Sequence, residues 1–262
     1  MHKQPIGLFD SGIGGTSIWK EVVKLLPNEN TIYLADSKNA PYGEKSSKEI
    51  LALAIKNTEI LISRGCKLVI VACNTATTNA IDYLRKHYNV PFIGIEPAIK
   101  PAALFSKTGA VGILATKGTL SSKLFEKTTR EYAKNITIIE QEGAGLVPLI
   151  EAGKINTPDT IQLLETYLKP MLQFSIDHLV LGCTHYPYLI PAIKNILGPN
   201  VNIIDSGEAV AKQTKTVLEK NVLLNTIKTT PNHQFFTNGN KKVLETILKP
   251  INLELSIKQL DF

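Results

Sequence analysis

Two cysteines of this chain stand in matching local settings. Each ends a short apolar run of strand type and precedes a polar pair, Asn74-Thr75 after Cys73 and Thr184-His185 after Cys183. A thiol near the amino end of a helix can have a pKa below its free value of about 8.5, because the helix dipole stabilises the thiolate. Two such thiols facing one small ligand could remove a proton from one face of a carbon and return a proton to the opposite face. The product would be the mirror image of the substrate.

That reaction needs hydrogen-bond donors as well as bases. Removing a proton next to a carboxyl group places charge on the carboxylate, so N–H and hydroxyl donors must already point there. Ser11, Asn74, Thr75 and Thr184 are donors of this kind. Because the chain has only three arginines, we expect backbone amides and hydroxyl groups, rather than a guanidinium, to hold the carboxylate.

Other chemistries use the same residue types but fit less well. A cysteine hydrolase could use Cys183 as nucleophile and His185 as base, but it would leave Cys73 without a role. A zinc site would need close-spaced ligand pairs, which these residues do not form. A dinucleotide fingerprint starting at Gly12 would need glycine where Ser17 stands. No Schiff-base lysine with a phosphate site stands out either, so we expect no cofactor and no metal.

Elements that could position these residues alternate along the chain. Short apolar runs alternate with longer segments of helical spacing, which is typical of a parallel α/β sheet. The runs expected as strands are Ile6–Phe9, Thr31–Ala35, Leu68–Ala72, Phe92–Ile95, Ala110–Ala115, Ile136–Glu140, Leu179–Gly182 and Val201–Ile204. The segments expected as helices are Ser17–Leu26, Ser47–Ser63, Thr77–His87, Leu120–Lys134, Pro158–Phe174 and Gly207–Lys220. Ser47 and Thr157 are the expected N-caps.

The order of these runs repeats in the two halves of the chain. The first half runs from Gly7 to Cys73 over 66 residues (73 − 7), and the second runs from Gly112 to Cys183 over 71 residues (183 − 112). The two cysteines therefore occupy equivalent positions, each just beyond a buried parallel strand. Ligands of open parallel sheets bind at that edge.

Two breaks divide the repeats. We expect the chain to cross between them at residues 96–101, where prolines interrupt any helix, and to return at residues 205–207. This predicts two similar α/β domains, one of residues 1–97 plus 208–262 and one of residues 98–207. The tail is too short for a core of its own, so it should dock on the first domain. Its expected elements are a strand at His233–Thr237, a helix at Asn240–Leu248 and a strand at Leu253–Ile257.

The composition excludes several classes of protein. The chain has 262 residues, 44% of them hydrophobic and 20% charged, so it can bury a sizeable core and is not disordered. Its net charge of +6 comes from dispersed lysines without aromatic interleaving, so we expect no nucleic-acid partner. Three cysteines without a C-x-x-C pair predict free thiols. We expect no membrane segment, no signal peptide and a cytoplasmic location.

Four motifs of the sequence match those of one enzyme family. They are Asp10-Ser11-Gly12-Ile13-Gly14-Gly15, Ala40-Pro41-Tyr42-Gly43, Val71-Ala72-Cys73-Asn74-Thr75-Ala76 and Leu181-Gly182-Cys183-Thr184-His185-Tyr186-Pro187. With these motifs the chain resembles the glutamate racemases of the cofactor-independent aspartate/glutamate racemase superfamily. The resemblance covers nearly the whole chain, and four motifs in order are far more specific than any one of them.

The resemblance implies a fold and a set of roles. The two parallel-sheet α/β domains would be related by a pseudo-twofold axis, with the active site in the cleft between them. Cys73 would deprotonate D-glutamate and Cys183 L-glutamate, each acting as acid in the other direction. Asp10 and His185 would assist the neighbouring thiols, and Glu151 would contact these site residues without touching the substrate. The substrate would be bound by Asp10, Ser11, Tyr42, Gly43, Asn74, Thr75, Thr116, Thr119, Thr184 and His185.

The resemblance also implies a partner and a role in the cell. The chain would form a homodimer, and its D-glutamate would supply bacterial peptidoglycan synthesis. The residues alone leave open an aspartate racemase, another amino-acid racemase of the superfamily, and an amino-acid-binding module without activity. Two segments depart from the family pattern: Ser37-Lys38-Asn39 stands where an arginine-containing stretch is frequent, and Tyr188 stands where leucine is common.

Overall fold

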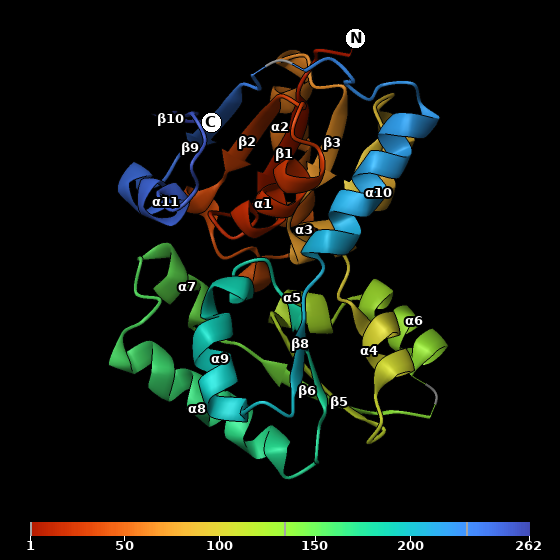
Figure 1. Cartoon of the computed structure of the whole chain (residues 1–262), viewed down its shortest axis with the longest axis vertical. Helices are drawn as coiled ribbons and strands as arrows, with labels where there is room; N and C mark the ends of the chain where they lie inside the picture. Colours follow the sequence, from red (N-terminus) through yellow and green to blue (C-terminus); the bar gives the residue numbers. More distant parts are fainter. Residues whose placement is uncertain (1, 134, 229) are drawn as a thin grey trace.

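The structure is a computed structural model that describes residues 2–133, 135–228 and 230–262. Its described strands form two separate sheets, one in each of two lobes that lie one above the other in Figure 1. Every strand pair in both sheets is parallel. The predicted α/β fold with two parallel sheets is confirmed.

The first sheet has the strand order β10-β9-β2-β1-β3-β4. Helix α1 packs against α10, and α2 packs against α3. Right-handed crossovers place these two pairs on opposite faces of the sheet. The strands are β1 (Ile6–Asp10), β2 (Thr31–Ala35), β3 (Leu68–Val71), β4 (Phe92–Gly94), β9 (His233–Thr237) and β10 (Leu255–Gln259). The helices are α1 (Thr16–Leu25), α2 (Ser47–Ser63), α3 (Asn74–His87), α10 (Gly207–Lys220) and α11 (Lys241–Leu248), with 3-10 turns η1 (Ser37–Asn39) and η2 (Tyr42–Glu44).

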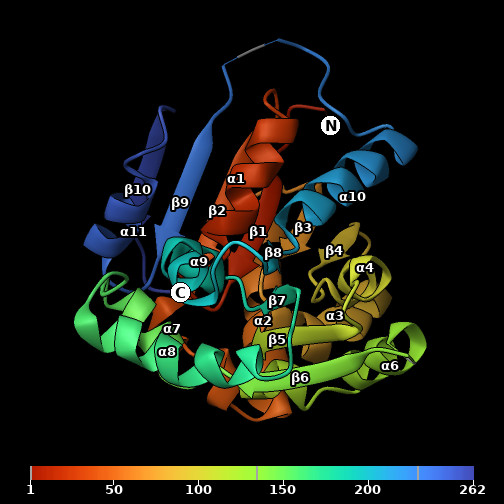
Figure 2. The ribbon, with the colours of Figure 1, turned by 60° about the horizontal axis from the view of Figure 1, so that its bottom comes forward.

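The second sheet has the order β6-β5-β7-β8, which repeats the order β2-β1-β3-β4 of the first. Helix α4 packs against α6, and α8 packs against α9 (Figures 1 and 2). The strands are β5 (Ala110–Ala115), β6 (Thr137–Glu142), β7 (His178–Gly182) and β8 (Asn202–Ile204). The helices are α4 (Ile99–Phe105), α5 (Lys117–Leu120), α6 (Lys123–Tyr132), α7 (Leu146–Glu151), α8 (Pro158–Leu172) and α9 (Ile190–Leu197), with the 3-10 turn η3 (Tyr186–Leu189).

Several helix starts differ from the prediction. Helix α2 is capped by Ser46 rather than Ser47, because Ser46 and Glu49 form a reciprocal capping box. Thr157 does precede α8, although its side chain makes no capping bond. Helix α3 begins at Asn74, three residues before the predicted Thr77, with Cys73 as its N-cap.

Two further segments differ from the predicted helices. The predicted helix at residues 120–134 is two helices, α5 and α6, and Lys134 lies outside the described residues. Ser122 divides them because its side chain caps α6. Residues 96–101 were expected as a plain crossing, but α4 begins at Ile99, because a proline in the first turn of a helix costs no backbone hydrogen bond.

The chain passes between the lobes twice. It crosses between β4 and α4 and returns between β8 and α10, and Ser206 Oγ of the return donates a hydrogen bond to the Glu96 carbonyl of the first crossing. Strands β9 and β10 then add to the first sheet beside β2, so the predicted docking of the tail is confirmed. The domain limits at residues 97 and 207 stay a prediction.

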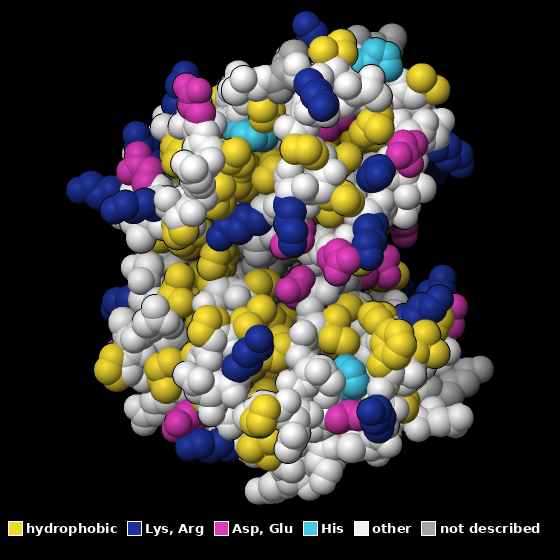
Figure 3. All heavy atoms as spheres, in the orientation of Figure 1, with side chains coloured by type: hydrophobic (Ala, Val, Ile, Leu, Met, Phe, Trp, Pro, Cys, Tyr) yellow, Lys and Arg dark blue, Asp and Glu magenta, His cyan; other side chains and the backbone are white. Residues whose placement is uncertain are grey.

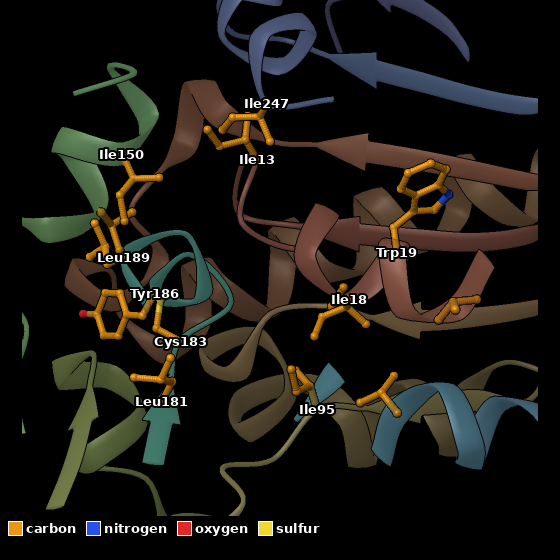
Figure 4. Close-up of a cluster of buried hydrophobic side chains, with 14 of the residues drawn as sticks. Ile13, Ile18, Trp19, Ile95, Ile150, Leu181, Cys183, Tyr186, Leu189 and Ile247 are labelled. Atoms are coloured by element: carbon orange, nitrogen blue, oxygen red, sulfur yellow. The ribbon is translucent and has the colours of Figure 1, made fainter. Parts of the chain in front are cut away.

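One cluster of buried apolar side chains includes members from both lobes. Ile13 comes from the first lobe, and Ile150 and Leu189 come from the second (Figure 4). On the face seen in Figure 3, Lys and Arg side chains are interspersed with acidic and apolar ones rather than gathered in one basic patch. None of the helices in the described part of the chain is both long and apolar enough to cross a membrane.

Candidate active site

A small cavity lies where the carboxyl ends of the two sheets face each other. Cys73 and Cys183 both line this cavity. Cys73 follows β3 of the first sheet, and Cys183 follows the equivalent strand β7 of the second. The other lining residues are Ser11, Pro41, Tyr42, Gly43, Asn74, Thr75, Thr116, Val147, Thr184 and His185.

The sulfur of Cys73 sits at the amino end of a long helix. It accepts a hydrogen bond from the Ala76 N–H at 3.4 Å and thereby serves as the N-cap of α3. Burial nevertheless raises the pKa of the Cys73 thiol well above its ordinary value, and the nearby Asp10 carboxyl raises it further. Cys73 is therefore protonated at rest, and formation of its thiolate depends on the donors at the helix terminus.

Asp10 stands at the end of β1, close to both halves of the cavity. Its Oδ2 accepts the Gly15 N–H at 2.7 Å, and its Oδ1 accepts the Thr184 hydroxyl at 3.3 Å. Burial raises the pKa of this carboxyl, while the positive charge of His185 and the Gly15 hydrogen bond act in the opposite direction. A buried carboxyl with a raised pKa takes up a proton more readily than an exposed one does.

The sulfur of Cys183 faces an imidazole ring. His185 Nδ1 lies 3.8 Å from Cys183 Sγ, and His185 Nε2 lies 2.6 Å from Glu151 Oε1. Burial alone would lower the pKa of His185, but the hydrogen bonds to Cys183 and Glu151 and the charge of Asp10 raise it well above its ordinary value. A protonated His185 can therefore donate to a Cys183 thiolate. In Figure 4 Cys183 lies beside Leu181 and Tyr186 at the end of the second sheet.

Glu151 ties this half of the site to the first lobe. It ends α7, and besides His185 it accepts the Ile13 N–H at 2.7 Å and the Ser37 hydroxyl at 2.7 Å. Two glycines make this approach possible. A Cβ on Gly12 would stand 1.8 Å from Glu151 Oε1, and one on Gly14 would stand 2.2 Å from His185 Nδ1. Neither position tolerates a side chain while the lobes keep this contact.

Unpaired and loosely paired donors line the rest of the cavity. The side-chain amide of Asn74 is buried and has no hydrogen-bond partner among the described residues. Thr75 and Thr116, from opposite lobes, lie 2.9 Å apart at their hydroxyl oxygens, and Thr119 Oγ1 lies 3.0 Å from Thr116 Oγ1. Hydroxyl groups that are hydrogen-bonded only to one another can turn their O–H bonds toward a carboxylate. This set of threonines therefore suits an acidic ligand.

The segment before α2 closes one side of the cavity. Tyr42 lines the cavity and is buried, and its hydroxyl donates to Asp36 Oδ2 at 2.5 Å rather than to a ligand. A Cβ on Gly43 would stand 3.0 Å from Thr116 Cβ of the other lobe. The lobes are therefore in close contact here.

The structure brings nearly all the sequence-predicted residues to this place. Asp10, Thr119 and Glu151 lie just behind the lining, each hydrogen-bonded to a residue that lines the cavity. Sequence reasoning missed the lining residues Pro41 and Val147 and the backbone donor Ile13. Pro41 belongs to the motif Ala40-Pro41-Tyr42-Gly43, which is a sequence signal for it, whereas backbone N–H directions have no sequence signal. The described residues hold no group of three or more His, Cys, Asp or Glu placed to bind a metal ion.

Known proteins resemble this chain over almost its whole length. Residues 6–214 match the family described as Asp/Glu/Hydantoin racemase. A glutamate racemase of Herpetosiphon aurantiacus is 44% identical over 254 residues, 97% of this chain and 100% of that protein.

Two crystal structures share the fold. One is Escherichia coli glutamate racemase in complex with L-glutamate and the activator UDP-MurNAc-Ala, with a TM-score of 0.87, 32% identity and coverage of 98% of each chain. The other is glutamate racemase of Francisella tularensis in complex with D-glutamate, with a TM-score of 0.84 and 30% identity. It covers 100% of this chain and 98% of that one.

Proposed function

The chain belongs to the Asp/Glu/Hydantoin racemase family, and we propose on that premise that it interconverts L- and D-glutamate by proton transfer between two cysteines. The observation that carries the mechanism is the shared cavity, which Cys73 lines from the first lobe and Cys183 from the second. Opposed acid and base groups around one carbon are what inversion by proton transfer requires.

The reaction moves one proton to the enzyme and one from it. With L-glutamate, the Cys183 thiolate takes the Cα proton, and the electron pair of the broken C–H bond delocalises into the α-carboxylate. The Cys73 thiol then gives its proton to the opposite face of Cα, which forms D-glutamate and leaves Cys73 as thiolate. The reverse reaction starts from that state.

Neighbouring groups make each transfer easier. His185, held by Glu151, stabilises negative charge on Cys183, and the Ala76 N–H does the same for Cys73. The Asp10 carboxyl opposes the Cys73 thiolate and instead would help Cys73 as a proton acceptor. We expect the free amide of Asn74 and the hydroxyls of Thr75 and Thr184 to hold the substrate carboxylates. Donors aligned in advance stabilise charge that develops during proton removal.

A chirality assay with both acidic amino acids tests this proposal. We expect optical rotation of L-glutamate to decay to zero, with much slower decay for L-aspartate. In heavy water the D-glutamate formed should carry deuterium at Cα, because its proton comes from a thiol that exchanges with solvent. Calorimetric heat on adding glutamate without loss of rotation would indicate a binding module instead, and faster decay with aspartate would overturn the substrate.

We also propose a homodimer and a cytoplasmic enzyme that supplies D-glutamate for peptidoglycan. The family resemblance supports the dimer and the cell-wall role, and three buried free cysteines suit a reducing compartment. Light scattering coupled to gel filtration would test the dimer by its mass. Depletion of the protein in its own cells should cause lysis that added D-glutamate relieves.

A further inference from the structure

Tyr188 connects the two lobes behind the Cys183 half of the site. It belongs to η3 of the second lobe, and its hydroxyl is hydrogen-bonded to Thr16 Oγ1 at the start of α1 in the first lobe. Lys20 of the same helix places its Nζ 4.7 Å from the centre of the Tyr188 ring. Leucine has no hydroxyl and no aromatic ring, so at this position it could contact neither Thr16 nor Lys20 in these ways.

The direction of the hydrogen bond follows from proton counting. Thr16 has one hydroxyl proton, and it donates that proton to the Ile13 carbonyl at 2.6 Å. Tyr188 must therefore donate to Thr16. Burial raises the pKa of the Tyr188 hydroxyl, so it stays protonated and keeps this donor role throughout the working pH range.

The chain of contacts continues to the catalytic groups. Ile13, whose carbonyl is held by Thr16, donates its N–H to Glu151, which is hydrogen-bonded to His185, which faces Cys183. Tyr188 lies three residues after His185 in the chain, so the backbone between these two residues closes the series of contacts into a ring. The ring includes residues of both lobes. Ser17 Oγ, beside Thr16, strengthens the ring with a bond to the Thr184 carbonyl at 2.9 Å.

We propose that Tyr188 is a positioning residue that fixes Glu151 and His185 relative to Cys183 by holding the amino end of α1. The proposal rests on the racemase function above and assigns to that site a residue outside the cavity lining. Tyr188 touches no substrate, so its effect must appear in the proton-transfer steps of Cys183 rather than in substrate binding.

The test compares Tyr188→Phe with the unchanged protein. Phenylalanine keeps the ring and its contact with Lys20 but removes the donor to Thr16. We expect kcat to fall about fivefold, the size of one net hydrogen bond, with KM changed less than about twofold. Because the equilibrium constant of a racemase is one, kcat/KM must be equal in both directions and cannot by itself reveal which half is impaired.

Deuterium isotope effects on kcat/KM locate the impaired half. Cys183 removes the Cα proton of L-glutamate, so slowing that step should enlarge the isotope effect with α-deuterated L-glutamate. With α-deuterated D-glutamate, Cys73 removes the deuteron and the slowed step is the later protonation by Cys183, so the isotope effect should shrink. A general loss of folded protein would change neither value.

Three variants serve as controls. Thr16→Val removes the hydrogen bond to Tyr188 and also the bond from Thr16 to the Ile13 carbonyl. The double variant with Tyr188→Phe should therefore cost no more than Thr16→Val alone, because Tyr188 acts only through Thr16. Thr16→Ser should retain most of the activity. Tyr88→Phe is the matched tyrosine control, since its hydroxyl donates to exposed Glu59 at 2.9 Å, away from the cavity.

Each outcome bears on a different claim. Opposite changes in the two isotope effects support the positioning role of Tyr188. Unchanged isotope effects and kcat in Tyr188→Phe, or equal changes in both directions, overturn that role while leaving the racemase function intact. Absence of racemisation by the unchanged protein overturns both.

Discussion

The Cys73 and Cys183 halves of the cavity occupy equivalent places in two sheets of the same strand order, but their sulfurs have different neighbours. Cys73 begins a helix of 14 residues and accepts a backbone N–H from it. Cys183 precedes a 3-10 turn of four residues and faces an imidazole. One half therefore uses a helix terminus and the other a side-chain relay to stabilise a thiolate.

The two halves therefore differ in their sensitivity to side-chain substitution. The helix terminus of Cys73 is backbone, which no side-chain substitution removes. The relay of Cys183 needs His185 immediately before η3, Glu151 from α7 and the Ile13 N–H from the first lobe. We therefore expect single substitutions around Cys183 to have larger effects than those around Cys73, the sulfurs themselves apart.

Replacing either cysteine should abolish racemisation, because proton transfer then has only one sulfur. Cys73→Ala and Cys183→Ala should each lower kcat for racemisation by roughly a thousandfold or more, because each removes the acid or base of one face. Polarimetry with glutamate from either enantiomer measures the loss. Cys66→Ala is the matched control: Cys66 is buried away from the cavity, burial raises its pKa to about 12, and its removal should leave kcat unchanged. Full activity in either of the first two variants would end the two-base account.

Breaking the relay should impair the Cys183 half alone. Glu151→Gln removes a charged hydrogen-bond partner of His185, and we expect kcat to fall roughly 10- to 100-fold. His185 faces Cys183, Asp10 and Glu151, and Glu151 raises its pKa, so the variant should lose imidazolium at lower pH. The alkaline limb of the pH–rate profile should move to lower pH. Glu165→Gln, at an exposed pair with Lys169, is the control; an unmoved limb would contradict the relay.

Asp10→Asn should lower activity and raise stability. The loss of a proton-exchanging group beside Cys73 should reduce kcat by roughly tenfold or more. Because burial raises the pKa of Asp10 in the folded protein, its contribution to stability is fully present below its ordinary pKa of 3.8 and is lost as pH rises through the raised pKa. The gain in melting temperature of the variant should thus be larger at pH 8 than at pH 3. Thermal unfolding at both pH values measures it, and a gain confined to acidic pH would refute the assignment.

The smallest expected effect concerns the contact between lobes on the Cys73 side. Gly43→Ala would place a Cβ 3.0 Å from Thr116 Cβ, which the threonine can relieve by a small shift. We expect KM for glutamate to rise about three- to fivefold with little change in kcat. Initial rates over a range of glutamate concentrations separate the two constants. A fall in kcat at constant KM would show that this contact affects chemistry rather than substrate binding.

Much of the fold followed from local sequence pattern. Runs such as Leu68–Ala72 and Leu179–Gly182 are apolar throughout because parallel strands are buried on both faces, and such runs are easy to detect. Helix starts were harder. Ser46 and Ser47 are equally good caps by residue type, and only the position of Glu49 three residues after Ser46 separates them.

The candidate site was predictable where side chains do the chemistry and not where backbone does. Motifs identified Cys73, Cys183 and His185, and the structure places all three at one cavity. The N–H groups of Ile13 and Ala76 could not be assigned, because their direction depends on how the loop after β1 and the start of α3 are folded. The polar contact of Tyr188 was equally hidden, since its partner Thr16 lies 172 residues away in sequence.

The two crossings between the lobes are joined by the hydrogen bond from Ser206 to the carbonyl of Glu96, and they limit how one lobe can move relative to the other. A body joined to its neighbour by two adjacent tethers swings readily about the line between them and resists twisting. Opening for glutamate to enter would therefore separate the sulfurs along one arc, and closing would return them to the same face-to-face placement at each turnover.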